Sequence, residues 1–400
     1  MNYILFDDKT WINLLPLTYT RPIAEIRIGI LTIKEKWEKH LNQNCSYYTQ
    51  DYLQQKYVAE YSDDNVFINA SVLPEENLVN EINSLKINCA LIKNDVLLAV
   101  RLSEKLAKNF KQVQNNFEDN NVALVNCVSE FVKINYSWDI FSLNEQAIKS
   151  DFQLITKGRK SQPISKTNNV IGKENIFIEQ GAKLEFVTIN AQTGFVYIGK
   201  DAEVMEGAVI RGPFVLCEHS VVKMSAKIYG PTTVGPHSKV GGELSNVVFF
   251  GYTNKAHDGF LGNAVVGEWC NIGADSNNSN LKNNYASVKL WDYKTNHFAD
   301  TGLQFCGLIM GDHSKCGINT MFNTGTIIGI SANIFGSGFQ RNFIPSFAWG
   351  GTSGFMTYRL NKVFQVAEKV MARRNVKLKD VDKEILSHIF NITEQYRNFK

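Results

Sequence analysis

Hydrophobic residues recur every six positions through much of the C-terminal half of the chain. The first run is unbroken and comprises Ile198, Val204, Ile210, Leu216, Val222, Ile228, Val234 and Val240. The period returns at Phe260, Val266 and Ile272, and again at Met310, Cys316, Phe322, Ile328 and Ile334. A helix repeats about every 3.6 residues and a strand about every two, so neither accounts for this pattern.

A period of six predicts one short strand and one tight corner per unit, with three units closing a triangular coil. The aliphatic residue then points into a prism and stacks on its equivalents in the neighbouring coils. Glycine directly follows it at Gly199, Gly235 and Gly241, where we expect it to adopt turn dihedrals. The first coil is expected near Ile171 and Gly172.

The repeat is interrupted twice, at residues 246–253 and 281–308. We interpret both as loops or bulged corners that leave the prism. Excursions from a rigid scaffold are frequent positions for binding groups.

The N-terminal part follows a different pattern. Short apolar runs at residues 3–6, 66–68, 90–92 and 97–100 predict strands, and residues 26–41 have helical spacing. Strands that alternate with helices indicate an α/β domain with a mostly parallel sheet. We therefore expect this α/β domain at residues 1–156, a polar linker at 157–169, a parallel β-helix at 170–350 and C-terminal helices at 351–400.

Composition narrows the class of protein. The net charge is only +3 and the basic residues are scattered, which argues against a nucleic-acid partner. No apolar run reaches the roughly 18 residues of a membrane span, and no secretory signal is visible. Seven cysteines without a CxxC spacing indicate reduced thiols, so we expect a cytoplasmic protein.

Residues 257–280, HDGFLGNAVVGEWCNIGADSNNSN, carry a family resemblance. The segment resembles the acetyltransferase core of the bifunctional N-acetylglucosamine-1-phosphate uridylyltransferase / glucosamine-1-phosphate N-acetyltransferase family. The shared residues are His257, Gly262, Ala264, Gly267, Asn271, Ile272, Gly273, Ala274 and Asn280. The resemblance implies a left-handed β-helix, acetyl-CoA as co-substrate and a homotrimer with the acyl site between subunits.

The same resemblance implies roles for particular residues. His257 would be the general base that takes the proton of the acceptor amine. Substrate would be held by Asn271, Asn280 and Phe260, and acetyl-CoA by the Ala274 backbone N–H, Lys289 and Lys294. The plainer alternatives are a corner histidine, corner asparagines and solvated loop lysines.

The N-terminal domain resembles a bacterial variant group with a sugar-nucleotidyltransferase-like domain, through LPLT at 15–18, TRP at 20–22, EIR at 25–27 and EKW at 35–37. This implies a nucleotide site formed by Arg21, Arg27 and Lys36, with Asp7 or Asp8 holding Mg²⁺. The alternative for the aspartates is a cap or a surface pair.

The chain also departs from the family. It has no glycine before Gly29, and Asn69-Ala70-Ser71 stands where an Asn-Gly-Asp would hold magnesium. Phe260 and Ser245 replace a tyrosine and a lysine that contact sugar phosphate in that family.

The leading hypothesis is N-acetylation of glucosamine-1-phosphate for the synthesis of UDP-N-acetylglucosamine, with uridylyl transfer left open. A second hypothesis is a hexapeptide acyltransferase that acts on another sugar nucleotide. The third is a sugar-nucleotide-binding module with an inactive N-terminal domain.

Overall fold

The computed structural model describes residues 1–399, which form two compact units. The N-terminal unit comprises Met1–Leu14, Thr20–Ile26 and Leu31–Asn135. The β-helix unit comprises the remainder, including the short segments Leu15–Tyr19 and Arg27–Ile30. Residues 136–156 therefore group with the β-helix by their contacts.

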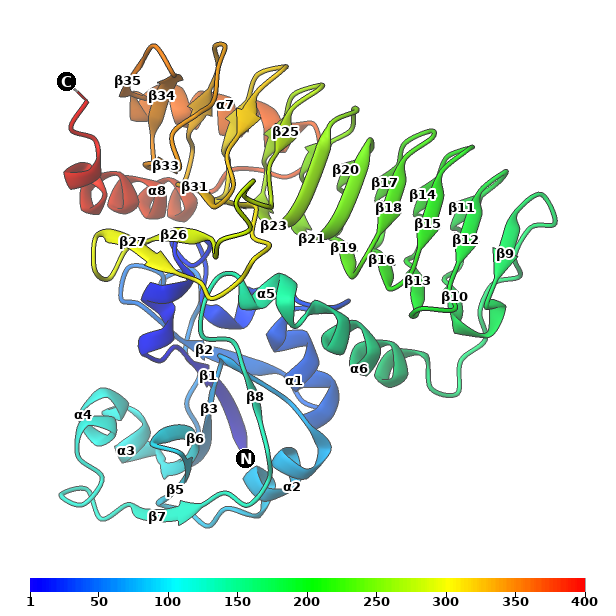
Figure 1. Cartoon of the computed structure of the whole chain (residues 1–400). Coiled ribbons are helices and arrows are strands. Elements are labelled where there is room, and N and C mark those ends of the chain that lie inside the picture. The colour runs from blue at the N-terminus through cyan, green and yellow to red at the C-terminus, as the bar shows by residue number, and fades with distance from the viewer. Residues whose placement is uncertain (400) are drawn as a thin grey trace. The chain divides into compact units, whose positions relative to one another are not determined.

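The N-terminal unit is an α/β domain built on one six-stranded sheet (Figure 1). The strand order is β2-β1-β3-β6-β5-β7, with bounds Cys45–Tyr48, Asn2–Phe6, Asp64–Asn69, Val96–Ser103, Cys89–Lys93 and Ala123–Asn126. The sheet is mostly parallel, as predicted, and β6 is its one antiparallel strand among the described residues, because it runs opposite to both β3 and β5. The other elements of the unit are α1 (Ile33–Leu41), α2 (Glu76–Ser84), α3 (Glu104–Ala107), α4 (Phe110–Asn115), β4 (Val72–Leu73), β8 (Val132–Lys133) and two 3-10 helices (Lys9–Leu14 and Ile23–Glu25).

Helix α1 begins seven residues later than the spacing predicted, at Ile33 instead of residue 26. The reason is a capping box at Thr32. The Thr32 hydroxyl accepts from the Glu35 N–H at 3.2 Å, and the Glu35 carboxylate accepts from the Thr32 N–H at 2.6 Å. These bonds satisfy backbone donors at the helix start and fix the helix boundary.

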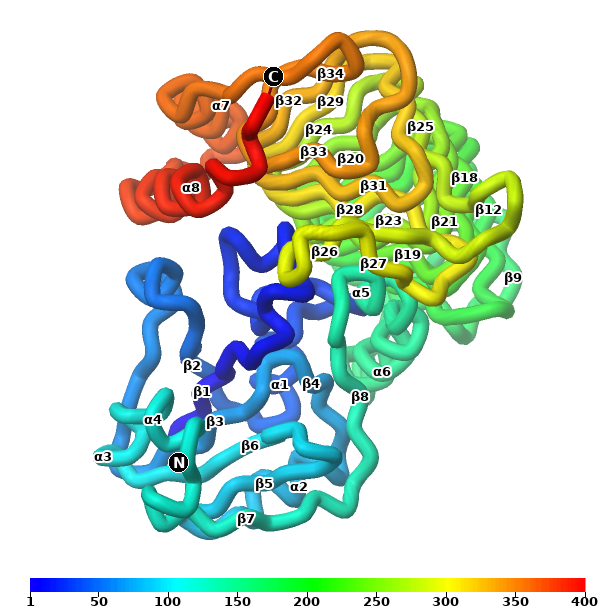
Figure 2. The backbone as a smooth tube through the Cα atoms, turned by 60° about the vertical axis from the view of Figure 1, so that its left-hand side comes forward, coloured from blue at the N-terminus to red at the C-terminus, as the bar shows by residue number. Residues whose placement is uncertain are grey.

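The β-helix unit is a left-handed parallel β-helix with three faces, followed by C-terminal helices (Figures 1 and 2). Face A consists of β11 (Lys183–Leu184), β14 (Glu203–Val204), β17 (Val221–Val222), β20 (Lys239–Val240), β22 (Asn254–Lys255), β24 (Asn271–Ile272), β29 (Lys315–Cys316), β32 (Asn333–Ile334) and β34 (Ala348–Gly351).

Face B follows face A in each coil, and face C follows face B. Face B consists of β9 (Asn169–Ile171), β12 (Thr188–Asn190), β15 (Val209–Arg211), β18 (Lys227–Tyr229), the first halves of β21 (Glu243–Gly251) and β23 (Phe260–Glu268), β25 (Asn277–Asn278) and β30 (Met321–Phe322). Face C consists of β10 (Ile176–Ile178), β13 (Val196–Ile198), β16 (Phe214–Leu216), β19 (Thr232–Val234), the second halves of β21 and β23, β28 (Leu308–Met310), β31 (Thr326–Ile328) and β33 (Phe343–Ile344).

The predicted aliphatic row forms the interior of the prism. All eight residues from Ile198 to Val240 are buried, and each pairs with its equivalent in the neighbouring coil. Two positions were predicted one residue off. Leu261, not Phe260, stacks on Leu244, and Val170, not the half-exposed Ile171, begins the row.

The glycines that follow the inward residues are required by space and not by backbone dihedrals. Gly199, Gly235 and Gly241 have no positive φ. A Cβ on Gly235 would lie 2.0 Å from the Phe250 carbonyl oxygen of the next coil. After Gly199 and Gly235 the left-handed conformation occurs two residues further on, at Asp201 and His237, and after Gly241 it occurs at the next residue, Gly242.

The two interruptions have different structures. Residues 246–253 do not leave the prism: β21 runs through most of them, with Val247, Val248 and Phe249 buried, and Asn246 and Tyr252 adopt the left-handed conformation at corners. Residues 281–308 do leave it, and they form the antiparallel hairpin β26 (Lys289–Asp292) and β27 (His297–Asp300).

Helices complete the unit. Two helices, α5 (Asp139–Ser142) and α6 (Asn144–Thr156), precede the β-helix. It is followed by β35 (Gly354–Thr357), α7 (Leu360–Ala372) and α8 (Asp380–Ile392). One 3-10 turn, Lys173–Asn175, lies between β9 and β10, and another, Glu394–Tyr396, follows α8. The apolar side of α7 packs on Trp269 through Ala367 and Met371. Within residues 1–399, no helix combines the length and apolar character needed to cross a bilayer.

We predict that Gly235→Ala destabilises the β-helix by about 1–3 kcal/mol, because its new methyl group would overlap a backbone carbonyl that cannot move independently. Gly317→Ala is the matched control, since Gly317 also follows an inward residue but has 3.6 Å of space for a Cβ. Urea unfolding followed by circular dichroism measures both. Equal midpoints for the two variants would contradict the close-approach explanation.

Candidate functional site

The His257 corner joins face A to face B. Residues 256–259 connect β22 to β23, and the imidazole of His257 is exposed on this corner. The next coil supports the corner, because the Asp275 N–H donates to the Asp258 carbonyl at 3.0 Å. Gly259 has φ +115°, and a Cβ there would lie 2.2 Å from the Ser276 carbonyl oxygen. The main chain on either side of His257 therefore has little freedom.

A cavity of about 530 Å³ opens on face A beside this corner. This volume is within the range of roughly 300–1,000 Å³ that small-molecule sites have. Its lining includes three of the residues predicted from the sequence, namely His257, Asn271 and Ala274. The remaining lining residues are Lys239, Tyr252, Asn254, Ala256, Trp269, Cys270, Ile272, Gly273, Lys315, Ile318, Val370, Arg373 and Arg374.

A polar row forms the floor of the cavity. Lys239, Asn254, Asn271 and Lys315 are paired in this order across four successive strands of face A. Each precedes an inward residue, so the alternation of a strand turns its side chain outward. The row offers amide groups between two ammonium groups.

An aromatic ladder forms one side of the cavity. The rings of His219, His237, Tyr252, Trp269 and His313 stack along one corner of the β-helix, with centroids 4.9, 4.8, 4.2 and 6.4 Å apart. All five residues have a left-handed backbone, so the corner repeats the same side-chain direction in every coil. Tyr252 and Trp269 contribute flat apolar surface to the cavity.

Helix α7 and the residues after it supply a further part of the lining. Val370, Arg373 and Arg374 line the cavity, and Arg374 Nη2 lies 3.5 Å from the Asn254 side-chain oxygen. Among the described residues that line the cavity, none is acidic and four are cationic. Arginine and lysine groups without competing carboxylates favour phosphate-bearing ligands.

Two lining residues have environments that limit their chemistry. Burial lowers the pKa of Lys315, whose ammonium donates to the His313 carbonyl at 2.8 Å. Burial raises the pKa of the Cys270 thiol, which contacts the Gly311 carbonyl oxygen at 3.2 Å. Only a thiolate is a competent nucleophile, so Cys270 is poorly suited to form an acyl-enzyme.

Phe260 and Asn280 lie together on face B, on the other side of the His257 corner. Both approach Gly262, where a Cβ would meet the Phe260 ring at 2.6 Å and the Asn280 amide nitrogen at 2.7 Å. The Asn280 amide donates to the Asn263 side-chain oxygen at 2.8 Å. Ser245 pairs with Gly262 in the adjacent strand. Asn271 and Asn280, both expected to hold substrate, are thus on two different faces, with the His257 corner between them.

The four cationic residues of the cavity were not predicted from the sequence. Lys289 and Lys294, expected to contact CoA, lie on the β26–β27 hairpin and are not among the lining residues. Lys239 and Lys315 carry one usable signal, because each directly precedes an inward residue of face A. Arg373 and Arg374 carry none, since only the packing of α7 brings them to the cavity.

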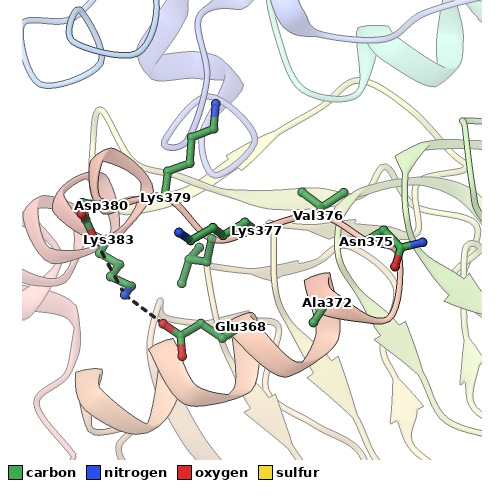
Figure 3. Close-up of a pocket in the computed structure, with 9 residues that line it drawn as sticks. Glu368, Ala372, Asn375, Val376, Lys377, Lys379, Asp380 and Lys383 are labelled. Atoms are coloured by element: carbon green, nitrogen blue, oxygen red, sulfur yellow. Dashed lines mark ion pairs between the residues drawn. The ribbon is translucent and has the colours of Figure 1, made fainter.

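A second hollow lies between α7 and α8. Its volume, about 930 Å³, is larger than that of the cavity on face A. It is lined by residues of the α7–α8 connection together with Glu368, Asp380 and Lys383 (Figure 3). Lys383 is paired with Glu368 at 2.8 Å. The lining of this second hollow includes none of the site residues predicted from the sequence, so we assign the site to the cavity on face A.

In the N-terminal unit, polar groups gather at the carboxyl ends of β1, β2 and β3, where open α/β sheets bind ligands. Asp7 accepts from the Ile23 N–H at 2.8 Å and from the Thr49 hydroxyl at 2.5 Å. Asp8 lies 3.3 Å from the Lys133 ammonium and 3.1 Å from the Asn69 amide.

These aspartates fit a magnesium ion poorly. Both Asp7 oxygens already accept hydrogen bonds, and Asp8 is neutralised by Lys133. Within residues 1–399, no cluster of three or more His, Cys, Asp or Glu side chains could bind a metal ion. We therefore derive no step through a metal at this edge.

The three predicted nucleotide-binding cations do not form one exposed group. Arg21 and Lys36 are buried in the N-terminal unit. Arg27 belongs to the β-helix unit, where its guanidinium donates to the Phe250 carbonyl at 3.1 Å and to the Ile30 carbonyl. These contacts give Arg27 a packing role.

Comparison with known proteins supports the identity of the N-terminal domain. Residues 3–160 match the family model described as sugar nucleotidyl transferase. No curated protein matches the chain. The chain therefore joins a sugar-nucleotidyltransferase-like domain to a left-handed β-helix of the hexapeptide type, a combination that indicates a transferase.

Asp7 gives a pH-dependent prediction. Burial is the largest cause that raises the pKa of Asp7 from 3.8 to about 7. The folded state then binds a proton at Asp7 more tightly than the unfolded state, so protonated Asp7 contributes to the stability of the fold. This contribution is complete below pH 4 and is lost as the pH rises through 7. At pH 8, Asp7→Asn should stabilise the N-terminal unit by at least about 1.4 kcal/mol, the value of one pKa unit.

Hydrogen exchange of peptides from β1 to β3, measured from pH 5 to pH 8, checks this. Asp95→Asn is the control, because that carboxyl group lies on the exposed turn between β5 and β6. An Asp7→Asn protein that loses protection at pH 8 would show that the charged carboxylate is required.

Proposed function

We propose that this protein is an acetyl-CoA-dependent N-acetyltransferase that acts on an amino-sugar phosphate, with glucosamine-1-phosphate as the first acceptor to test. The observation that carries the proposal is the cavity on face A, where His257, Asn271 and Ala274 meet a set of cations and two aromatic rings. A CoA thioester needs cations for its phosphates, apolar surface for its adenine and pantetheine arm, and polar groups at the reacting carbonyl.

The proposed reaction places the thioester in the cavity and the amine at the His257 corner. The neutral amine attacks the carbonyl carbon and forms the C–N bond, while His257 takes the amine proton. The backbone N–H of Ala274 would stabilise the oxyanion of the tetrahedral intermediate. The C–S bond then breaks, and the CoA thiolate leaves and takes up a proton.

The acceptor would approach from face B, where Phe260, Asn280 and Ser245 surround Gly262. This division gives the two substrates separate surfaces with His257 between them. This side is poorly suited to bind a phosphate. The residue that pairs with Phe260 is the acidic Glu243, and the side chain of the adjacent Lys227 is largely exposed. That observation favours the second candidate, in which the acceptor is another amino-sugar nucleotide whose phosphates are bound elsewhere.

We assign the N-terminal unit a sugar-nucleotide-binding role. The family match supports nucleotide recognition, and the carboxyl edge of the sheet is the expected place for it. The poor fit to magnesium argues against efficient uridylyl transfer, which the same assays test through release of pyrophosphate from UTP.

A homotrimer is part of the proposal. Phe186, Met224 and Ile318 are 64%, 64% and 69% exposed, and each stands two residues after an inward residue of face A. His257 and Ala274 occupy the same position in their own coils. A ridge of exposed apolar side chains in line with the base is suited to pack against a second copy of this chain beside the site.

The acetyl-transfer prediction is tested with acetyl-CoA and a panel of amino-sugar phosphates and nucleotides. We expect thiol release and an N-acetylated product by mass spectrometry, with kcat reduced about 10²–10⁴-fold in His257→Ala. His297→Ala, an exposed histidine on the β26–β27 hairpin, should match the unmodified protein.

The cavity is tested by the same assay. Arg374→Ala should raise the KM for acetyl-CoA about tenfold, the loss of one charge-assisted contact, whereas Lys294→Ala should not. Absence of acetylation with every acceptor would refute the proposed activity, and a KM effect confined to Lys294→Ala would move the CoA site to the hairpin.

The assembly prediction is a solution mass three times the 45.2 kDa of the chain. Met224→Asp should lower that mass, since a carboxylate would be buried in the interface. Val128→Asp is the control, because Val128 is 83% exposed in the N-terminal unit. Sedimentation equilibrium decides the point, and a monomeric unmodified protein would contradict it.

A further inference from the structure

One lysine stands in the interior row of the β-helix. On the eight strands of face A from β11 to β32 the inward positions are Leu184, Val204, Val222, Val240, Lys255, Ile272, Cys316 and Ile334, so seven are apolar or a thiol and one carries an amine. Lys255 is 1% exposed. The periodic pattern did not reveal it, because the repeat is lost between Val240 and Phe260 in the sequence.

The ammonium of Lys255 is bonded to two consecutive corners of the β-helix. Its Nζ donates to the His257 carbonyl at 2.7 Å and to the Gly241 carbonyl at 3.2 Å. Burial lowers the pKa of Lys255 to about 8, although the nearby Asp258, Cys316 and Asp275 act in the opposite direction.

Stability alone does not account for a lysine at this position. An aliphatic residue fills the same position in the adjacent coils without desolvating an amine, and replacing buried charges by apolar groups of similar volume is frequently neutral or stabilising. The lysine therefore costs stability that a valine or leucine would not. Its location directly beneath the His257 corner is the feature that distinguishes this coil.

The His257 corner needs support from inside. The next coil holds it through Asp258 and Gly259, but neither contact fixes the peptide group of His257 itself. The hydrogen bond from the Lys255 ammonium does fix that peptide group, because its acceptor is the carbonyl oxygen of His257 itself. A small displacement of a reacting group can cost a large part of the rate.

We propose that Lys255 is a positioning residue that holds the main chain of His257 from inside the β-helix, so that the imidazole is presented to substrate in one orientation. The catalytic consequence rests on the proposed acetyl transfer, whereas the positioning itself does not.

The first test is Lys255→Met, which keeps an unbranched side chain that is one atom shorter and removes the amine. We expect an unfolding midpoint equal to or above that of the unmodified protein, a kcat at least tenfold lower and a KM for acetyl-CoA within twofold. Ile334→Met, at an inward position of the same face away from His257, should leave both constants unchanged. In a His257→Ala background, Lys255→Met should have no further effect on kcat, because the two residues act as one unit.

The second test does not depend on activity. Histidine labelled with ¹³C at Cε1 gives one signal for each of the seven histidines, and His257→Ala assigns the signal of His257. Lys255→Met should shift or broaden that signal and leave His219, His237 and His313 unchanged.

The outcomes separate the two proposals. A perturbed His257 signal in a protein that acetylates no acceptor would sustain the positioning role and refute the acetyl transfer. An unchanged His257 signal in folded Lys255→Met, or an unchanged kcat in an active protein, would overturn the positioning role. Should Lys255→Met fail to fold, Lys255→Leu repeats the test with the residue type found in other coils. Failure of both variants to fold would make Lys255 a stability residue and overturn the proposal as well.

Discussion

The stacking of inward side chains from coil to coil is the interaction on which the β-helix unit depends. Each coil is too small to bury its own apolar face, so it is stable only against its neighbours. Stacking fixes the register of every strand, and the register decides which residues stand next to one another. The polar row from Lys239 to Lys315 exists because an outward residue must align with its equivalent whenever the inward ones do.

The coils around His257 are irregular. Regular coils of face A are 18 residues apart, as between Val221 and Lys239, whereas Lys239 and Asn254 are 15 apart. The first and last steps of face A also depart from 18 residues, with 20 between Lys183 and Glu203 and 16 between Asn333 and Trp349. Two coils later the chain leaves the prism for the β26–β27 hairpin before returning to β29. Departures from local regularity are expected where function requires them. Here they coincide with the interior lysine, the Gly259 corner and the cavity.

The two units differ in how completely their sites are built. The cavity of the β-helix unit combines a candidate base, amide groups, aromatic surface and cations without a carboxylate among its lining residues. The carboxyl edge of the N-terminal sheet instead holds two aspartates that are already hydrogen-bonded or paired, one of them with its pKa raised to about 7. These contrasting electrostatics are the physical reason for the proposal that the chemistry takes place in the β-helix unit and recognition in the other.

The sequence alone determined the parts that follow from periodicity. The eight inward residues from Ile198 to Val240, the strands β1, β3, β5 and β6 and the helices α7 and α8 could be predicted because each is defined by neighbours within a few positions. Resemblance over 24 residues placed His257, Asn271 and Ala274, which the structure finds in one cavity. Predictions from local spacing were wrong where a single contact decides the structure. The Thr32 cap starts α1 later than the spacing indicated, and Phe260 faces outward instead of into the prism.

Tertiary structure alone decided what comes together from distant parts of the chain. Arg373 and Arg374 reach the cavity because α7 packs its apolar side on Trp269, and no local pattern encodes that contact. Asn280 is separated from Asn271 because a corner of the β-helix lies between their faces. Lys255 could be seen as an interior residue only once the register of its coil was known, since its side chain looks polar and surface-bound in the sequence. Sequence spacing reports which residues share a face, whereas packing decides which faces meet.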